Sequence, residues 1–252
     1  MGREPIDAAA AILGGASSVF VLSGAGMSTE SGIPDFRGPQ GLWTKHPEAM
    51  KMFDLHAYVG SADVRRAAWR VRREGAMMGA EPNGGHRALV GWERAREVRI
   101  ATQNIDGLHQ RAGSSDVWEL HGTFWESMCL SCDDRRPISE TFARLDEGED
   151  DPLCHACGGI LKSATVAFGQ QLDPQVIQAA ALASASCDVA LALGTSLMVQ
   201  PAASLCDLAV DNGHPLIIIN AEATPYDDVA EVVVNDVIST SLAAIDDVIA
   251  GL

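Results

Sequence analysis

Short apolar runs that end in glycine or in small polar residues recur along this chain and constrain its fold more than any other feature. Four of them lead directly into a turn: residues 19–22 into Gly24-Ala25-Gly26, residues 98–102 into Gln103-Asn104, residues 189–193 into Gly194-Thr195-Ser196, and residues 216–219 into Asn220-Ala221-Glu222. Continuous apolar strands that alternate with helices are typical of a parallel sheet covered on both faces. Ligands bind at the carboxyl ends of such strands. The sequence therefore predicts an α/β fold whose four polar turns converge on one ligand.

The remaining elements follow from periodicity and capping residues. Helices are predicted over residues 4–15, 63–74, 85–96, 174–186, 201–212 and 237–250, and further strands over 117–120, 164–168 and 231–235. Ser61 and Asp173 are the expected N-caps of two helices. Residues 126–160 are predicted to be a loop-rich insert with little apolar content, which needs a stabilising cross-link, such as a disulfide or a bound metal, to fold.

Composition restricts the partners of the chain. Its 252 residues are 47% hydrophobic, which is enough for a sizeable core, and its net charge is −16. Nucleic-acid binding needs a basic surface and is not expected. An acidic surface suits lysine-rich partners, although it also simply keeps a protein soluble. No apolar run approaches the length of a membrane span, and no signal peptide is evident, so a cytoplasmic location is expected. No feature of the sequence sets an oligomeric state.

Four of the six cysteines form two closely spaced pairs, Cys129 with Cys132 and Cys154 with Cys157. In a cytosolic chain such pairs indicate a metal site rather than disulfides. Two thiolate pairs complete a tetrahedral zinc site with no open position for water, so the zinc is expected to be structural. The alternative is four unrelated thiols.

The turn Gly24-Ala25-Gly26 resembles a phosphate cradle, because glycine lets backbone N–H groups approach a ligand. It lacks the third glycine of the dehydrogenase fingerprint and the acidic residue that usually follows a second strand. Asp35-Phe36-Arg37 continues the loop with groups that can pair with pyrophosphate and shield a sugar from water. Asn220 and Glu222 can accept ribose hydroxyls from another strand end. Tight structural turns remain the alternative for both segments.

Two histidines are candidates for a general base near neutral pH. His121 ends a short predicted strand just before the insert. His109 lies in the run Gln103-Asn104-Ile105-Asp106-Gly107-Leu108-His109. A structural role is the alternative for each.

The order and spacing of these motifs resemble those of the sirtuins over nearly the whole chain, from about residue 16 to the C-terminus. The motifs are GAGMSTESGIPDFRGPQGLW, TQNIDGLHQRAG, Leu120-His121-Gly122, the two cysteine pairs, GTSLMVQPAA and IIINAEATPYDD. The resemblance implies an NAD-dependent protein lysine deacylase. It implies a Rossmann-like domain formed by residues 1–42, 81–125 and 161–252, a cofactor loop and helical module over 43–80, and a zinc-binding insert over 126–160.

The resemblance also assigns roles to individual residues. NAD contacts are implied for Gly24, Ala25, Gly26, Asp35, Phe36, Arg37, Gln103, Asn104, Ile105, Asp106, Gly194, Thr195, Ser196, Asn220, Glu222, Asp236 and Val237. His121 is the implied base, and Asn104 and Asp106 are counted with it as catalytic. Val166, Phe168 and Gly169 are expected to pair with an acyl-lysine peptide as an added strand. The implied reaction yields free lysine, nicotinamide and an acylated ADP-ribose.

Two departures from the family pattern concern the substrate. Many relatives have an Arg-Pro pair before the strand at 164–168 and an acidic residue after it, whereas this chain has Lys162-Ser163 and Gln170. Sirtuins that remove succinyl or malonyl groups carry a Tyr-x-x-Arg pair, and Trp69 with Arg72 stands in its place. Arg72 is expected either to bind a dicarboxylic acyl group or to be a solvated arginine of a basic helix. Deacetylation is the main expectation. The alternatives are desuccinylation or demalonylation, mono-ADP-ribosyl transfer and a non-catalytic NAD-binding module.

Overall fold

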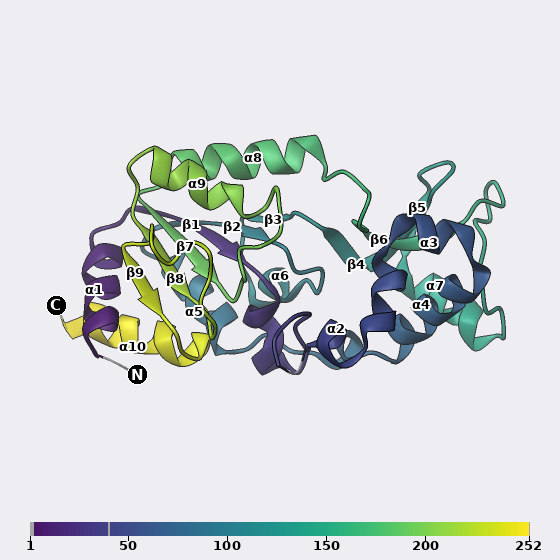
Figure 1. Cartoon of the computed structure of the whole chain (residues 1–252), viewed down its shortest axis with the longest axis horizontal. Helices are drawn as coiled ribbons and strands as arrows, with labels where there is room; N and C mark the ends of the chain where they lie inside the picture. The colour runs from purple at the N-terminus through teal and green to yellow at the C-terminus, as the bar shows by residue number, and fades with distance from the viewer. Residues whose placement is uncertain (1–2, 40, 252) are drawn as a thin grey trace.

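A computed structural model describes residues 3–39 and 41–251, which form a large lobe and a small lobe along one long axis (Figure 1). The large lobe is built on a six-stranded parallel sheet of order β3-β2-β1-β7-β8-β9. Its strands are β1 (Ser18–Ser23), β2 (Glu97–Thr102), β3 (Val117–Glu119), β7 (Val189–Leu193), β8 (Leu216–Ile219) and β9 (Val232–Val234). The predicted parallel sheet is confirmed, and β7 and β8 have the predicted bounds.

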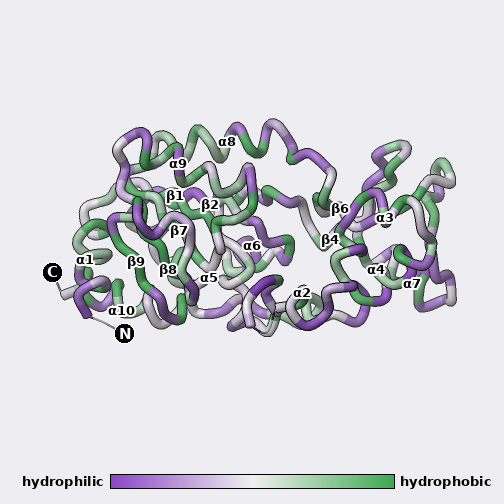
Figure 2. Tube along the Cα trace, viewed as in Figure 1, coloured by the Kyte–Doolittle hydropathy of each residue, from purple (hydrophilic) through white to green (hydrophobic). Residues whose placement is uncertain are grey.

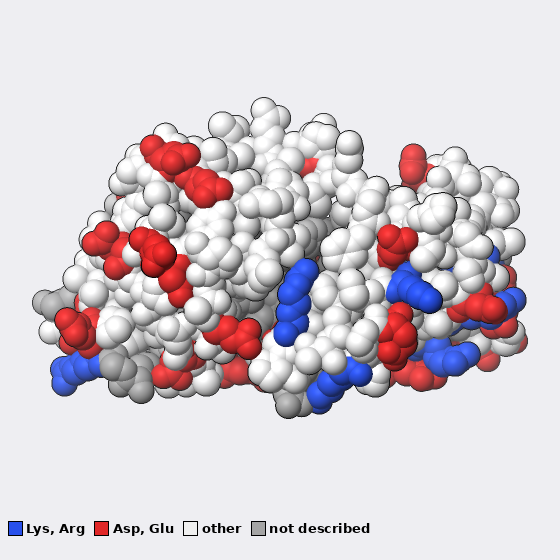
Figure 3. Space-filling model, viewed as in Figure 1, with Lys and Arg blue, Asp and Glu red and all other residues white. Residues whose placement is uncertain are grey.

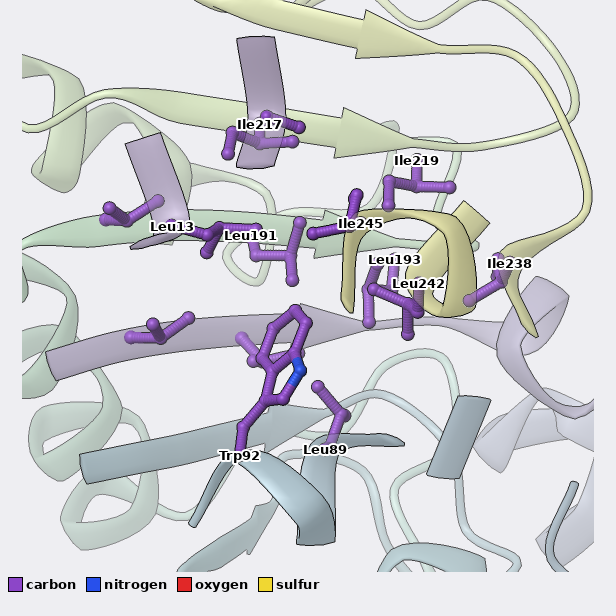
Figure 4. Close-up of a cluster of buried hydrophobic side chains, with 14 of the residues drawn as sticks. Leu13, Leu89, Trp92, Leu191, Leu193, Ile217, Ile219, Ile238, Leu242 and Ile245 are labelled. Carbon is purple, nitrogen blue, oxygen red and sulfur yellow. The ribbon is translucent and has the colours of Figure 1, made fainter. Parts of the chain in front are cut away.

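Helices cover both faces of this sheet because its strands alternate two sets of apolar side chains. On one face α1 (Arg3–Gly14), α5 (Gly84–Trp92) and α10 (Ile238–Gly251) enclose a core of valine, leucine and isoleucine (Figure 4). On the other face α8 (Pro174–Ala185) and α9 (Ser204–Asp211) pack on a second core. Figure 2 shows the hydrophobic strands between these layers. The predicted helices are confirmed apart from their ends, and α9 begins three residues later than predicted because residues 201–203 form turns.

The small lobe is more ordered than the predicted loop-rich insert. It contains a three-stranded antiparallel sheet of β5 (Arg135–Pro137), β4 (Gly122–Cys129) and β6 (Leu161–Thr165), together with α3 (Leu55–Gly60), α4 (Ala62–Glu74) and α7 (Ile138–Asp146). A small core joins these elements through Trp69, Phe124 and Phe142. Short elements lie where the chain passes between the lobes: η1 (Ala25–Ser31), α2 (Leu42–Lys45), η2 (Pro47–Phe53) and η3 (Ala76–Gly79). Helix α6 (Leu108–Ala112) lies between β2 and β3 of the large lobe.

The strand predicted over residues 164–168 lies three residues earlier, as β6, and joins the small sheet instead of the large one. Its polar residues Lys162 and Ser163 are buried because each has hydrogen-bond partners. An apolar pattern therefore could not locate its start.

The acidic loop, residues 146–151, begins at the last residue of α7 and is anchored by arginines of α4. Arg65 pairs with Asp151 at 2.8 Å, half-buried Arg66 pairs with Asp150, and exposed Arg73 pairs with Asp146. Basic and acidic side chains accordingly lie side by side on the small lobe, whereas the visible face of the large lobe carries mainly acidic ones (Figure 3). Among the helices of residues 3–39 and 41–251, none combines the length and apolar character that a membrane span requires.

Candidate active site

The two central strands, β1 and β7, direct their following loops to opposite sides of the sheet, which makes this the switch point where parallel sheets bind ligands. The loops contact each other through backbone: Gly24 N–H donates to Leu193 O at 2.9 Å, and Gly26 N–H donates to Gly194 O at 2.8 Å. A Cβ on Gly26 would lie 2.8 Å from Gly194 Cα, and Gly194 has φ +58°. Both the close approach and the left-handed backbone thus require glycine.

The loop after β2 joins this contact through side chains. Asn104 Nδ2 donates to Gly24 O at 2.9 Å and to Ser28 Oγ at 3.1 Å, while Gln103 Nε2 donates to Thr195 Oγ1 at 2.9 Å. The loops after β1, β2 and β7 therefore form one polar surface.

Asp106 is buried beneath this surface. Its carboxylate accepts from Ser28 Oγ at 2.6 Å and from Leu108 N–H at 2.9 Å. Burial raises the pKa of the carboxyl, and these hydrogen bonds partly offset the shift. Ile105, between Asn104 and Asp106, contacts the small-lobe core.

His121 stands at the junction of the lobes, directly before β4. Its Nδ1 lies 3.0 Å from Gln103 O. A carbonyl only accepts, so Nδ1 carries the proton and Nε2 of the neutral ring is left as a base. Burial lowers the pKa of His121, which favours this neutral form.

His109, the other candidate base, is a core residue with 1% of its surface exposed. Its Nε2 lies 2.9 Å from Ser23 Oγ, and its ring packs 4.8 Å from that of His86. Burial lowers the pKa of His109 to about 3 and that of His86 to about 4, so both rings are neutral at physiological pH. The structure therefore places His121, and not His109, at the polar surface.

The loop of Asp35, Phe36 and Arg37 extends from the glycine turn toward the small lobe. Asp35 accepts a hydrogen bond from Gly38 N–H at 3.1 Å, and an open cavity of about 250 Å³ adjoins it, lined by Thr29, Gly32, Ile33, Pro34 and Asp35. The Phe36 ring lies 4.7 Å from Trp43, and the Arg37 guanidinium lies 4.7 Å above the same indole. Trp43 also contacts Phe168, at 5.5 Å. This loop is thus joined to the segment predicted to bind peptide.

The predicted ribose and adenine contacts lie after the outer strands β8 and β9. Asn220 Nδ2 donates to the backbone oxygen of Glu222 at 2.7 Å, and Asn220 N–H donates to Val234 O at 3.1 Å. The side chain of Glu222 is exposed, and Asp236 accepts from Val237 N–H at 2.7 Å. These residues share the carboxyl edge of the sheet with Ser196 and the other loops.

The predicted substrate residues are divided between the surface and the interior. Val166 N–H donates to His121 O at 2.7 Å, and Phe168 is 44% exposed, next to exposed Gly169. Trp69, by contrast, is 1% exposed in the small-lobe core. Arg72 donates to Ser163 Oγ at 2.9 Å and to Ala68 O at 3.2 Å, so it is not a solvated arginine.

The four paired cysteines converge at one end of the small lobe. Their sulfur atoms all lie within 4.8 Å of one another, and contacts of 3.4–3.7 Å join them. These separations exceed a disulfide bond of about 2.05 Å and match the roughly 3.8 Å between thiolates of a zinc tetrahedron. The cluster fits one structural zinc ion held by Cys129, Cys132, Cys154 and Cys157.

Comparisons with known proteins agree with this geometry. The family model described as "Sir2 family" matches residues 24–201.

The chain belongs to the Sir2 family.

Curated relatives and solved structures support the assignment along almost the full length. The chain is 50% identical over 230 residues to "NAD-dependent protein deacetylase 2" of Streptomyces coelicolor, covering 90% of this chain and 95% of the relative. It is 39% identical over 231 residues to "NAD-dependent protein deacetylase" of Thermodesulfovibrio yellowstonii, covering 90% and 89%. A structure described as "Structural Basis for the Mechanism and Regulation of Sir2 Enzymes" superposes with a TM-score of 0.90 at 35% identity, covering 99% of each chain. "Sir2 bound to acetylated peptide" gives a TM-score of 0.84 at 32% identity, covering 98% of each.

Sequence reasoning missed several residues that shape this Sir2 site. Ser28 bridges Asn104 and Asp106, and Thr102 accepts hydrogen bonds from Ser23 Oγ and from Asn104 N–H. Trp43 links the loop of Asp35, Phe36 and Arg37 to Phe168. Ser28 and Trp43 lie inside the motif that carried the family resemblance, but nothing in their spacing identifies their partners.

Proposed function

We propose that this chain is an NAD-dependent protein lysine deacetylase. The observation that carries the proposal is the position of His121, whose base nitrogen is set by Gln103 O at the junction of the glycine loops and the peptide segment. The relatives named above are described as deacetylases of this kind, which supports the same activity here.

The residues of the four carboxyl-edge loops fit a dinucleotide. The turns at Gly24–Gly26 and Gly194–Ser196, with Arg37, are proposed to hold the pyrophosphate. Gln103 and Asn220 with Glu222 are proposed to bind the two riboses, and Asp236 and Val237 the adenine. Asn104, Ile105 and Asp106 line the proposed nicotinamide pocket, closed by Asp35 and Phe36. The bound dinucleotide supplies a ribose carbon that accepts the acyl oxygen as nicotinamide leaves.

The chain itself supplies positioning and a proton acceptor. Val166, Phe168 and Gly169 are proposed to align the acyl-lysine peptide, which brings its amide to the ribose. His121 Nε2 then removes a proton from a ribose hydroxyl, because its other nitrogen is fixed as a donor by Gln103 O. Removal of that proton lets the hydroxyl attack the acyl carbon. The lysine amine then leaves, and addition of one water molecule gives acylated ADP-ribose and free lysine.

The test is a reaction of the full-length protein with NAD and an acetyl-lysine peptide, followed by mass spectrometry. We expect free lysine, nicotinamide and acetylated ADP-ribose in equal amounts. ADP-ribose attached to protein, without peptide deacetylation, would favour mono-ADP-ribosyl transfer instead. An absence of released nicotinamide would favour a non-catalytic NAD-binding module.

Removal of succinyl or malonyl groups is the second candidate for the acyl specificity. Arg72 is half-buried beside Ser163, near the peptide segment, which is the observation in its favour. Its hydrogen bonds to Ser163 and Ala68 already occupy two of its nitrogens, and Trp69 offers no exposed group. We therefore propose acetyl as the preferred group. The same assay with a succinyl-lysine peptide decides between acetyl and succinyl as the preferred group. Succinyl turnover that is faster than acetyl turnover, and that is lost in Arg72→Met, would contradict the preference for acetyl.

A further inference from the structure

Strand β6 is an edge strand whose backbone groups alternate between a paired side and a free side. Ile160 O accepts from Leu130 N–H, and Val166 N–H donates to His121 O, so even-numbered residues face β4. The odd-numbered residues of this stretch therefore face the free edge, because the backbone alternates along a strand. This edge is where an added peptide strand would pair.

The first part of the free edge is closed by buried donors. Leu161 O accepts from Tyr58 Oη at 2.8 Å. Ser163 O and Thr165 O both accept from Lys162 Nζ, the former at 2.8 Å. Tyr58 and Lys162 are 3% and 2% exposed, so neither can move aside easily. These buried side chains cover the edge along Leu161, Ser163 and Thr165, so an added peptide strand is expected to pair beyond Thr165.

At Ala167, the next position of the free edge, a loop side chain occupies the backbone N–H. Ala167 N–H donates to the side-chain oxygen of Gln170 at 2.9 Å, and Ala167 O accepts from Gln170 N–H at 2.9 Å across a turn. Gly169 has φ +88°, which lets Phe168 and Gly169 form this turn, and both are exposed. The carbonyl of Ala167 keeps a second lone pair, whereas its single N–H is fully used. The side chain that uses it is only half-buried and lies in a loop.

We propose that Gln170 competes with the substrate backbone for Ala167 N–H and so sets peptide affinity. This inference rests on the proposed deacetylase function and deepens it. A peptide that adds as a strand presents a carbonyl to the same N–H, so the Gln170 amide must first leave. The hydrogen bond lost with Gln170 offsets the one gained with the peptide. Gln170 therefore lowers peptide affinity without touching the reacting atoms.

The experiment measures binding of a fluorescein-labelled acetyl-lysine peptide with otherwise uncharged residues, by anisotropy, to the full-length zinc-loaded protein without NAD. Gln170→Ala is expected to lower the Kd about two- to tenfold, the effect of one hydrogen bond. Gln170→Glu is expected to raise it, because a charged acceptor holds Ala167 N–H more tightly. Gln171→Ala removes an identical, exposed side chain from the next position and is expected to leave the Kd unchanged.

Turnover separates this role from a structural one. With NAD present, Gln170→Ala is expected to lower KM for the peptide and to leave kcat unchanged. A Kd that stays the same or rises in Gln170→Ala would show that the side chain only supports the turn, and would overturn the proposal. If the wild-type protein forms no acetylated ADP-ribose, the proposed function itself fails, and the role of Gln170 fails with it.

Discussion

The large lobe buries its sheet between two layers of helices, whereas the small lobe has one short core and depends on groups that need specific partners. The large lobe contains two continuous apolar clusters, one on each face of the sheet. The small lobe combines a few aromatic residues with four thiols, a buried lysine and arginine–carboxylate pairs. Burial of apolar surface requires no particular partner, but thiolates and charges lose their contribution when one partner is removed. The small lobe is therefore the part that a single change can unfold.

The largest effect is expected from removing zinc. Cys132→Ser, or a strong chelator, should unfold the small lobe and abolish deacetylation, because a structural zinc site contributes on the order of 10 kcal/mol to folding. The large lobe should still bind NAD. Thermal unfolding would then show loss of the small-lobe transition only, and added zinc should restore it in the chelated protein.

The matched control for this prediction is Cys206→Ala. Cys206 is buried in the large-lobe core, outside the thiol cluster. This variant should retain zinc and activity. Activity and thermal stability that survive complete zinc removal would contradict the structural role of the metal.

The second effect concerns His121, which belongs to the junction and to neither core. His121→Ala should lower turnover about 10²- to 10⁴-fold through loss of the general base. NAD binding and both unfolding transitions should stay as in the wild type. Because burial lowers the pKa of His121 and the neutral ring is the proposed active form, the acidic limb of kcat/KM should lie below pH 6.5.

Exposed His56, in α3, supplies the control, and His56→Ala should be fully active. Near-normal turnover in His121→Ala would contradict the proposal that His121 is the general base. An acidic limb above pH 6.5 would show that His121 is not held neutral.

The success of sequence reasoning differed between the lobes for the same physical reason. Strands β7 and β8 were predicted to the residue because they are apolar throughout and end in turn residues. In the small lobe, α7 was missed, although Ile138, Phe142 and Leu145 have the spacing of an amphipathic helix, because it is only nine residues long and lies in a largely polar segment. Strand β6 was misplaced because Lys162 is buried by hydrogen bonds that no local pattern reveals.

The site shows the same limit. The convergence of the loops at Gly24, Gln103 and Gly194 follows from a parallel sheet, so it was predictable from the alternation of apolar strands with helices. Contacts such as Asn104 with Gly24 O and Ser28 with Asp106 depend on side-chain geometry across distant segments. Sequence spacing holds no information about them.

The third effect tests the large-lobe core by pH. Buried His86 and His109 have pKa values lowered to about 4 and about 3, while unfolded histidines titrate near 6.5. The unfolded state therefore binds more protons below pH 6.5, and the free energy of unfolding should fall as the pH drops toward 4. For His86 the shift corresponds to about 3 kcal/mol. Urea unfolding of the large lobe between pH 4 and 7 measures it.

The double variant His86→Gln with His109→Gln is the control for this dependence of the free energy of unfolding on pH. It removes both titrating rings and should show a weaker decrease in stability over the same range. Equal slopes in the variant and the wild type would assign the acid sensitivity to carboxylates instead.

The smallest effect distinguishes two neighbouring ion pairs of the small lobe. The side chains of Arg65 and Asp151 are 11% and 14% exposed, and Arg65 also donates to Tyr58 O and Val59 O. Arg66 pairs with Asp150, whose side chain is 73% exposed. Arg65→Gln leaves a shielded carboxylate and two carbonyls without their donors, so it should lower the small-lobe midpoint by roughly 4–8 °C. Arg66→Gln should leave it unchanged, since water replaces an exposed partner. Equal shifts would mean that charge alone, and not burial of the pair, anchors the acidic loop to α4.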